Sequence, residues 1–390
     1  MLTGKNILLG VCGSIASYRA CELVRYLQKK GSNVRVVMTP QATEFVSKMT
    51  FQALTGDKVF TNWNDGETGL EHVTVGRWAD CFVIAPATAN TIAKIRFGIA
   101  DDFLTSVALA YGKPIVLAPA MNTKMLENPA TLENIRTLKE RGYRFVEPKE
   151  GILACGEEGA GKIADIEDIY LEILRAITPQ KLKGKKVLVT AGGTREFFDP
   201  IRYISNASSG QMGYNIAKMA YAFGAEVVLV SAPSCFTSPS QIRKIEIISA
   251  TDMFEAVLKE FRDTDIVVMN AAVADFRPMG RSSQKLKKDK ESLTVQLKPN
   301  PDILTEISKI KREEQILIGF AAESENILQN ARDKMRRKNL DIIIANPIEV
   351  FSKDKYRGVI IFPDKDVEVV SDSKEEASFL IMKIIVENFT

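Results

Sequence analysis

The sequence predicts an α/β protein of two Rossmann-like domains, each built on a parallel sheet. Residues 4–11 and 184–191 begin in the same way, as short buried runs with polar residues before them and a glycine-containing turn after them. Each run is followed by a segment with helical periodicity, a glycine and a second apolar run. Strand, helix and strand in this order indicate right-handed βαβ units, and 390 residues are enough for two domains with separate cores.

The later elements repeat in the same order in both halves. The first half has a predicted helix at about 16–30 and predicted strands at 34–39 and 81–86. The second half has a predicted helix at about 211–223 and predicted strands at 227–231 and 266–271. Between the halves, residues 176–186 read as a helix end, a proline and a charged linker. We therefore place the domains at 1–180 and 181–390.

The composition excludes several classes of protein. The net charge is only +3, from 52 basic and 49 acidic residues, so nothing global indicates a nucleic-acid or membrane partner. His72 is the single histidine, which rules out a two-histidine metal site. The five cysteines include no Cys-x-x-Cys pair, and neither a secretory core nor a membrane span is visible. We expect a cytoplasmic protein in a reducing compartment.

Function is expected in the loops that follow the strands, because ligands of open parallel sheets bind outside the carboxyl ends of the strands. Neither first turn is a Gly-x-Gly-x-x-Gly fingerprint, and neither second strand ends in the acidic residue that holds an NAD ribose. A nicotinamide-dependent dehydrogenase is therefore disfavoured. The Gly13-Ser14 turn before a helix still suits a phosphate group, although any tight connection could use it.

Three further loops of the first half carry candidate chemistry. Residues 86–91 hold small hydroxyl and amide side chains, residues 119–125 place Asn122 after a strand, and residues 151–162 surround Cys155 with glycines, as in a mobile lid. Taken one at a time, these residues have commoner structural roles. Asn122 could simply make a turn, Cys155 could be inert, and His72 could be a structural imidazole.

Together, however, these loops resemble the flavin-dependent cysteine decarboxylases over essentially the whole first half. Gly13-Ser-Ile-Ala16 is similar to their phosphate turn, residues 86–91 to their Pro-Ala-Ser-Ala-Asn-Thr element with Thr88 for Ser, and residues 119–125 to their substrate clamp. Leu126 stands where some relatives have an aromatic residue. The resemblance implies a flavodoxin-like fold and a trimer-based assembly with FMN at a subunit interface. It assigns the FMN site to Gly13, Ser14, Ile15, Thr39, Pro86, Ala87, Thr88, Ala89, Asn90 and Ser106.

The decarboxylation that this resemblance implies assigns a role to each of the three residues. Asn122 would hold the substrate carboxylate, and His72 would be a base near the oxidation step. Cys155 would protonate the enethiolate left after CO2 departs, because a thiol pKa can lie near that of its target. The flavin would end the cycle in the redox state in which it began.

The second half contains several separated cationic groups. Arg281, Lys285 and Lys287 lie in a predicted loop, and Lys334 and Lys338 lie four residues apart on one face of a predicted helix. Each group alone could be solvated charge. Facing one crevice, they would suit a triphosphate with Mg2+. No P-loop motif occurs.

This half resembles the phosphopantothenate–cysteine ligases, with Arg202-Tyr-Ile-Ser-Asn206, Ser208-Ser-Gly210, Ala271-Ala-Val-Ala-Asp275 and Lys285-Leu-Lys-Lys288 in the family order. Leu286 stands where many relatives have Ile. The resemblance implies that Asn206, with Arg202 nearby, holds an acyl-cytidylate and that CTP is the nucleotide, accompanied by Mg2+ whose ligands are not assigned. It assigns CTP to Ala271, Ala272, Val273, Asp275, Lys285, Pro301, Asp302, Ile303, Leu304, Phe320, Lys334 and Lys338.

The two activities would be consecutive, so the whole chain resembles the bifunctional coenzyme A biosynthesis family. CTP would activate 4'-phosphopantothenate, cysteine would displace CMP, and the product would be decarboxylated to 4'-phosphopantetheine. A short linker suggests a homo-oligomer, a dodecamer in which dimers of the second half join trimers of the first. Two alternatives stay open: a non-catalytic flavoprotein that acts as a regulatory subunit, and a nucleotide-binding module acting on a different acid and amine.

Overall fold

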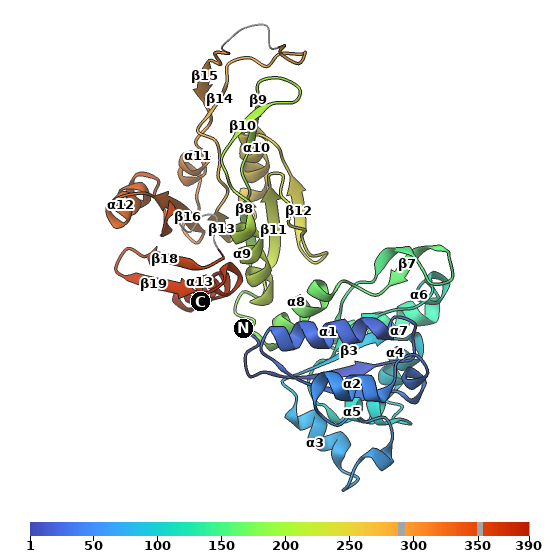
Figure 1. Ribbon diagram of the computed structural model, residues 1–390. Helices are drawn as coiled ribbons and strands as arrows, with labels where there is room; N and C mark the ends of the chain where they lie inside the picture. Colours follow the sequence, from blue (N-terminus) through green and yellow to red (C-terminus); the bar gives the residue numbers. More distant parts are fainter. Residues whose placement is uncertain (288–292, 349–353, 390) are drawn as a thin grey trace. The chain divides into compact units, whose positions relative to one another are not determined.

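The computed structural model describes residues 1–287, 293–348 and 354–389, and it contains two compact units, Met1–Thr178 and Pro179–Thr390 (Figure 1). Lys288, the last residue of the Lys285-Leu-Lys-Lys288 motif, lies outside the described residues. Among the helices that the structure describes, none combines the length and the apolar character that a membrane crossing requires.

The first unit is built on a five-stranded parallel sheet in the order β2-β1-β3-β4-β5. Its strands are β1 (Asn6–Val11), β2 (Asn33–Met38), β3 (Cys81–Ala87), β4 (Val116–Pro119) and β5 (Arg144–Phe145). An antiparallel hairpin of β6 (Lys149–Ile152) and β7 (Glu158–Lys162) follows. The order 2-1-3-4-5 is that of flavodoxin-like folds, which bind their flavin where the connections reverse between β1 and β3.

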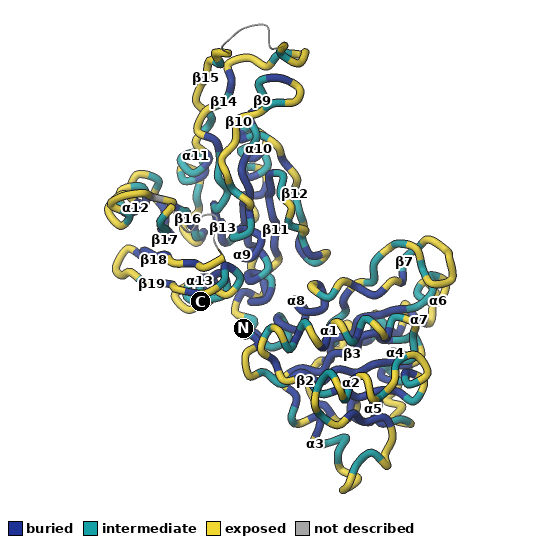
Figure 2. Tube along the Cα trace, in the orientation of Figure 1, coloured by how far each residue is buried: buried dark blue, intermediate teal, exposed yellow. Residues whose placement is uncertain are grey.

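Helices cover both faces of this sheet. They are α1 (Ser17–Lys29), α2 (Lys48–Thr55), α3 (Glu71–Trp78), α4 (Ala89–Phe97), α5 (Phe103–Ala110), α6 (Thr123–Leu126), α7 (Pro129–Glu140) and α8 (Ile166–Ile177), with short 3-10 turns η1 (Pro40–Glu44) and η2 (Trp63–Asp65). Helices α1 and α8 pack together on one face (Figure 1). On the other face, Phe82 and Ile84 of β3 join one buried cluster with Phe103 and Leu104 of α5. Figure 2 shows the strands buried between these layers.

The second unit contains an eight-stranded sheet in the order β12-β11-β8-β13-β16-β17-β18-β19. Its strands are β8 (Lys186–Ala191), β11 (Glu226–Ser231), β12 (Arg243–Glu246), β13 (Ile266–Met269), β16 (Ile316–Glu323), β17 (Ile342–Pro347), β18 (Tyr356–Ile361) and β19 (Asp366–Ser371). Neighbouring strands from β12 to β17 are parallel, whereas β18 and β19 are antiparallel additions. The predicted fold class is confirmed, and the sheet of this unit is mixed at one edge.

The helices of the second unit also lie on two faces. They are α9 (Gln211–Ala222), α10 (Ala250–Phe261), α11 (Ile303–Lys309), α12 (Ile327–Arg337) and α13 (Lys374–Phe389). Buried side chains of α10, α11 and α12 share one apolar cluster with the strands, while α9 packs against α13. Short buried apolar strands flanked by amphipathic helices are what a parallel sheet covered on both faces requires.

Two short antiparallel pairs extend from the second sheet, and we call them together the arm (Figure 1). One pair is β9 (Arg195–Phe197) with β10 (Tyr203–Ser205), and the other is β14 (Phe276–Pro278) with β15 (Leu297–Pro299). The Ser282 N–H donates to the Phe198 carbonyl at 2.9 Å, and the Arg281 guanidinium lies 5.1 Å from the centre of the Phe197 ring. These contacts join the two pairs.

Candidate active sites

In the first unit, the turns after β1, β2 and β3 meet at the carboxyl edge of the sheet. The Cys12 N–H donates to the Pro86 carbonyl at 3.3 Å, and the Thr39 N–H donates to the Val11 carbonyl at 3.0 Å. A side chain at Gly13 would bring its Cβ to 2.6 Å from the Cβ of Gln41, so only glycine lets the first turn lie against η1. The predicted FMN segments after β1, β2 and β3 are therefore brought together.

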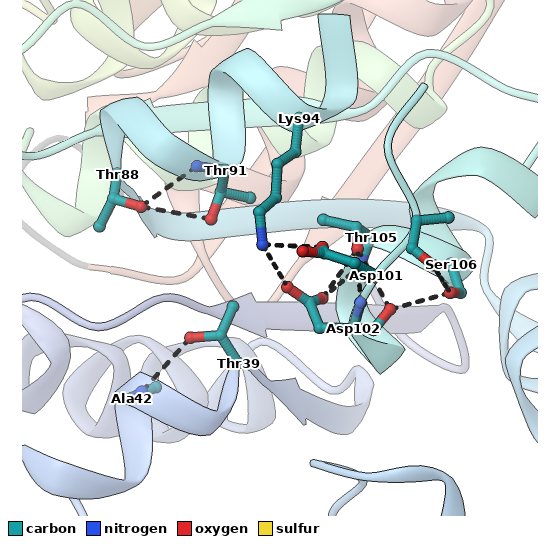
Figure 3. Close-up of polar contacts among 10 residues, drawn as sticks. Thr39, Ala42, Thr88, Thr91, Lys94, Asp101, Asp102, Thr105 and Ser106 are labelled. Atoms are coloured by element: carbon teal, nitrogen blue, oxygen red, sulfur yellow. Dashed lines mark hydrogen bonds and ion pairs between the residues drawn. The ribbon is translucent and has the colours of Figure 1, made fainter. Parts of the chain in front are cut away.

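The hydroxyl groups predicted to contact FMN already make local hydrogen bonds (Figure 3). The Thr39 Oγ1 accepts from the Ala42 N–H at 3.3 Å, and the Thr88 Oγ1 caps α4 by accepting from the Thr91 N–H at 3.4 Å. The Ser106 hydroxyl is buried in α5 and donates to the Asp102 carbonyl at 2.8 Å. These bonds fix the orientation of the side chains.

A cavity of about 640 Å³ connects the first turn with the loop after β4 and with the β6–β7 hairpin. Ser14, Ile15 and Ala16 line one part of it, and Asn122 and Cys155 line another. This volume lies within the range of roughly 300–1,000 Å³ that is typical of small-molecule sites. The structure thus places the predicted phosphate turn, the predicted carboxylate-binding amide and the predicted proton donor around one cavity.

Asn122, Cys155 and Glu157 form a contiguous polar cluster in this cavity region. The Asn122 Nδ2 donates to the Cys155 Sγ at 3.4 Å and to the Glu157 Oε2 at 3.2 Å, while its Oδ1 accepts from the Lys124 N–H at 2.9 Å. The Cys155 Sγ lies 3.8 Å from the Glu157 Oε2. Glu157 lies two residues after Cys155 in the same hairpin and was not among the residues predicted from the sequence.

The predicted lid is the β6–β7 hairpin, and it packs directly on the segment that carries Asn122. The Met121 N–H donates to the Gly161 carbonyl at 3.0 Å, and the Thr123 hydroxyl donates to the Ala160 carbonyl at 2.7 Å. Gly161 has φ +133°, and a Cβ there would lie 2.1 Å from the Met121 carbonyl oxygen. Glycine at this position is therefore what brings Cys155 to Asn122.

We expect Gly161→Ala to displace the hairpin, because the new Cβ would collide with backbone that cannot move away easily. CO2 release should fall at least tenfold, with a loss of roughly 1–3 kcal/mol in stability from backbone strain. Gly156→Ala is the matched control: it has φ +85° in the same hairpin, but nothing lies within 4 Å of its Cβ. An equal fall in CO2 release in the two variants would show that backbone strain, and not the contact with Met121, causes the loss.

His72 lies away from this cavity. It is on α3, where its ring packs edge-on against Trp63 with 5.1 Å between centroids, and its buried Nδ1 has no hydrogen-bond partner among the described residues. It is not among the described residues that line the cavity, and Figure 1 shows α3 and β7 at separate ends of the first unit. The structure does not bring His72 to Asn122 and Cys155 of the same chain.

In the second unit, Asn206 lies against the loop after β13. Its Nδ2 donates to the Val273 carbonyl at 3.0 Å and to the Ala272 carbonyl at 3.3 Å. The Thr190 Oγ1 at the end of β8 accepts from the Ala271 N–H at 3.1 Å. Two parts of the predicted ligase site are thus joined at the edge where the connections reverse between β8 and β13.

Lys334 and Lys338 both reach predicted nucleotide-binding residues. The Lys334 ammonium donates to the Phe320 carbonyl at 2.8 Å, and Lys338 pairs with Asp302 and donates to the Thr305 hydroxyl at 2.8 Å. Burial lowers the pKa of Lys338, and the negative charge of Asp275 opposes this shift. Asp275, Pro301–Leu304, Phe320 and both lysines therefore form one neighbourhood.

Arg202 and Lys285 instead lie in the segments that connect the strands of the arm, Arg202 directly before β10 and Lys285 between β14 and β15. The Arg202 Nη2 donates to the Leu286 carbonyl at 2.8 Å, and the buried Asp199 carboxylate accepts from the N–H groups of Ile201, Arg202 and Leu286. Burial alone would raise the pKa of Asp199, but these donors and the Arg202 charge hold it below its usual value. Lys285 itself is exposed, and no described contact joins it to Lys334 or Lys338.

Among the described residues, no group of three or more His, Cys, Asp or Glu side chains is arranged to hold a metal ion.

The strand order and cavity of the first unit, followed by a second Rossmann-like unit, define a two-domain α/β protein whose first domain has a flavodoxin-like strand order. Residues 1–178 match the Flavoprotein family model, and residues 182–389 match that of the DNA/pantothenate metabolism flavoprotein C-terminal domain. The chain belongs to the family of coenzyme A biosynthesis bifunctional proteins. It is 43% identical over 396 residues to the Bacillus subtilis member, covering 99% of this chain and 97% of that protein. The Escherichia coli member is 37% identical over 398 residues, covering 100% and 98%.

Among solved structures, the C-terminal domain of a coenzyme A biosynthesis bifunctional protein is 37% identical and covers 54% of this chain and 97% of that one, with a TM-score of 0.47. The family membership confirms the resemblance seen in the motifs. The chain is a bifunctional enzyme of coenzyme A biosynthesis with decarboxylase and ligase activities, and full-length similarity favours catalysis over the regulatory alternative.

Proposed function

We propose that residues 181–390 join cysteine to 4'-phosphopantothenate with CTP through an acyl-cytidylate, and that residues 1–180 decarboxylate the product to 4'-phosphopantetheine with FMN. The observation that supports this most strongly is the cavity in which the Ser14–Ala16 turn, Asn122 and Cys155 meet. It has the turn before α1 at one part and an amide beside a thiol at another.

The residues after β1, β2 and β3 fit FMN. The cavity reaches the turn before α1, where a side chain at position 13 would clash, and no acidic residue stands in the first turn of α1. Gly13–Ile15, Thr39, Pro86–Asn90 and Ser106 would hold the cofactor, with the helix N-terminus favouring its phosphate. When bound, FMN supplies a two-electron acceptor and donor that activates the carbon bearing the carboxylate.

The polar cluster of Asn122, Cys155 and Glu157 would then act on the substrate. The Asn122 amide would donate to the substrate carboxylate, in place of its present bond to Glu157. The Cys155 thiol, 3.4 Å from that amide, would deliver a proton to the enethiolate carbon after CO2 has left. The hairpin packed on Met121–Thr123 would exclude water from this intermediate.

In the second unit, Asn206 and Arg202 would hold the acyl-cytidylate, and the neighbourhood of Lys334 and Lys338 would bind CTP. Lys285 would neutralise charge on the triphosphate together with Mg2+, which would arrive with the nucleotide. Cysteine's amine would attack the activated acyl carbon and release CMP.

We further propose a dodecamer of first-unit trimers joined by second-unit dimers, in the cytoplasm. The separation of His72 from Asn122 supports the trimer, since His72 would serve a neighbouring copy. All five cysteines are free, which accords with a reducing compartment.

The function is tested by supplying purified chain with 4'-phosphopantothenate, cysteine, CTP and Mg2+ and following pyrophosphate and CO2. Both products should appear, and CO2 should require the cysteine adduct. Flavin-loaded protein that releases neither product would refute the proposal.

We expect His72→Asn and Asn122→Ala each to lower CO2 release about 100-fold. The first substitution removes the proposed base, and the second removes the amide proposed to hold the substrate carboxylate. If His72 acts across a subunit boundary, mixed oligomers of the two variants should regain about a quarter of the sites, since random mixing pairs an intact residue from each chain with that frequency. Co-expression followed by CO2 measurement tests this. No recovery in verified mixed oligomers would contradict the role across the boundary.

A further inference from the structure

Glu157 is the acidic member of the polar cluster beside the first-unit cavity. Its Oε2 accepts from the Asn122 Nδ2 at 3.2 Å and lies 3.8 Å from the Cys155 Sγ. The hairpin turn holds the residue in place, because the Leu153 N–H donates to the Glu157 carbonyl at 2.9 Å. One carboxylate oxygen therefore meets both of the side chains to which the proposed decarboxylation gives a role in this cavity.

The Asn122 amide is fully engaged within this cluster. A side-chain amide has two N–H donors, and the Asn122 Nδ2 directs them at the Cys155 Sγ and at the Glu157 Oε2. Its Oδ1 accepts from the Lys124 N–H. A substrate carboxylate can therefore reach this amide only by displacing one of the two acceptors. The Glu157 carboxylate is the acceptor that it matches in chemistry and charge.

The negative charge of Glu157 is only weakly compensated by its surroundings. The Lys124 ammonium lies 4.0 Å from the Glu157 Oε1, and these two side chains are 84% and 52% exposed. Exposed ion pairs of this kind contribute little, so the charge still acts on the cavity. Arg19 also lines the cavity, but it pairs with Glu22 at 3.0 Å, and no described contact joins it to Glu157.

We propose that Glu157 is an internal competitor that sets how tightly the decarboxylase site holds its substrate. Its carboxylate occupies the Asn122 amide in the empty site, yields the amide to the substrate carboxylate, and takes it back once CO2 has left. The proposal rests on the decarboxylase function proposed above. It gives Glu157 a role that no residue predicted from the sequence has.

The competition acts on the substrate and not on the product. Two carboxylates at one amide repel each other, and for charges about 4 Å apart in water this repulsion corresponds to about fivefold in affinity. The decarboxylated product has no carboxylate, so it leaves the bond between Asn122 and Glu157 intact. Because the repulsion disappears as CO2 departs, Glu157 weakens the bound substrate without weakening the state that follows.

The first test measures CO2 release from 4'-phosphopantothenoylcysteine by full-length Glu157→Gln. Glutamine keeps the shape of the side chain and an acceptor for Asn122 but removes the charge. The KM for the substrate should fall about fivefold and kcat should not rise, while the inhibition constant of 4'-phosphopantetheine stays unchanged. Glu158→Gln is the matched control, because Glu158 is exposed and no described contact joins it to Asn122 or Cys155. An unchanged or higher KM, or an equal change in both constants, would overturn the proposal.

The second test needs no decarboxylase activity and compares two thiol reagents at Cys155. Iodoacetate carries a carboxylate and iodoacetamide does not. Since both attack the same thiolate, the ratio of their rates is independent of how far the thiol is ionised. Glu157→Gln should raise the rate with iodoacetate relative to iodoacetamide about fivefold at low salt, and added salt should shrink this gain. Mass spectrometry of the alkylated peptides reads the rates, with the exposed Cys235 of the same chain as the internal reference.

The two tests separate this proposal from the proposed function. An unchanged reagent ratio at Cys155 in Glu157→Gln would overturn the competitor, even in protein that releases CO2 normally. If the wild type releases no CO2 but the ratio at Cys155 responds to Glu157→Gln and not to Glu158→Gln, the proposed decarboxylation fails. The exclusion of carboxylates by Glu157 then stands.

Discussion

Replacing Cys155 by serine should leave the release of CO2 in the first turnover intact and lower the yield of saturated thiol product about 100-fold. A serine hydroxyl is a far weaker acid than a thiol, so it would protonate the enethiolate slowly, and a positioned proton donor contributes about 10²–10⁴-fold. The geometry near position 155 should survive, because Asn122 can donate to an oxygen as well as to the present sulfur at 3.4 Å.

The measurement separates the two products: CO2 is trapped, and the thiol products are resolved by mass spectrometry, since the unreduced product is two mass units lighter. Cys235→Ser is the control, because Cys235 is also an exposed free cysteine but belongs to the second unit. A normal yield of saturated product from Cys155→Ser would remove the thiol from the proton transfer.

Strand positions in both units could be predicted because each buried strand is a short, nearly uninterrupted apolar run. Residues 4–11 and 184–191 predicted β1 and β8, and the observed strands begin two residues later at Asn6 and Lys186. The final strands were not anticipated. β18 and β19 alternate buried and exposed residues at the sheet edge, and local patterning does not specify which neighbour such a strand pairs with, or in which direction.

The candidate site residues differ in how well the local sequence could predict them. Asn122 and Cys155 were proposed from motifs, and the contact between them depends on the hairpin packing that Gly161 permits. Glu157 was missed because an acidic residue in a glycine-rich loop has the same pattern as a solvated one.

His72 and Lys285 were predicted from motifs, but in the structure they lie apart from the other residues of their predicted sites. Motifs assigned each a role, but a motif contains no information about which copy of the chain supplies the residue. Helix α3, which carries His72, lies at the far end of the first unit from β7 in Figure 1, and Lys285 lies between β14 and β15 of the arm. The proposed oligomer with shared sites would account for both positions, because a symmetric interface can place a loop of one subunit at the site of its neighbour.

Replacing Lys285 by glutamine should lower CTP-dependent pyrophosphate release about 100-fold or more, while decarboxylation of supplied 4'-phosphopantothenoylcysteine continues normally. The ammonium would stabilise charge that develops on the triphosphate, and removing one such group costs about 10²–10³-fold in comparable sites. The loop should keep its place, because Arg202 and Asp199 hold it through the backbone of Leu286 and not through Lys285.

Lys287→Gln is the matched control, since Lys287 is exposed two residues further along the same loop. If general positive charge in the loop attracts CTP, the two variants should lose activity equally, and the loss should shrink as salt is raised. If Lys285 contacts the triphosphate, only its own variant should fail, at every ionic strength. Wild-type pyrophosphate release by Lys285→Gln would show that the lysine is merely solvated, and the anionic charge would then have to be met by Lys334 and Lys338 at the Phe320 edge.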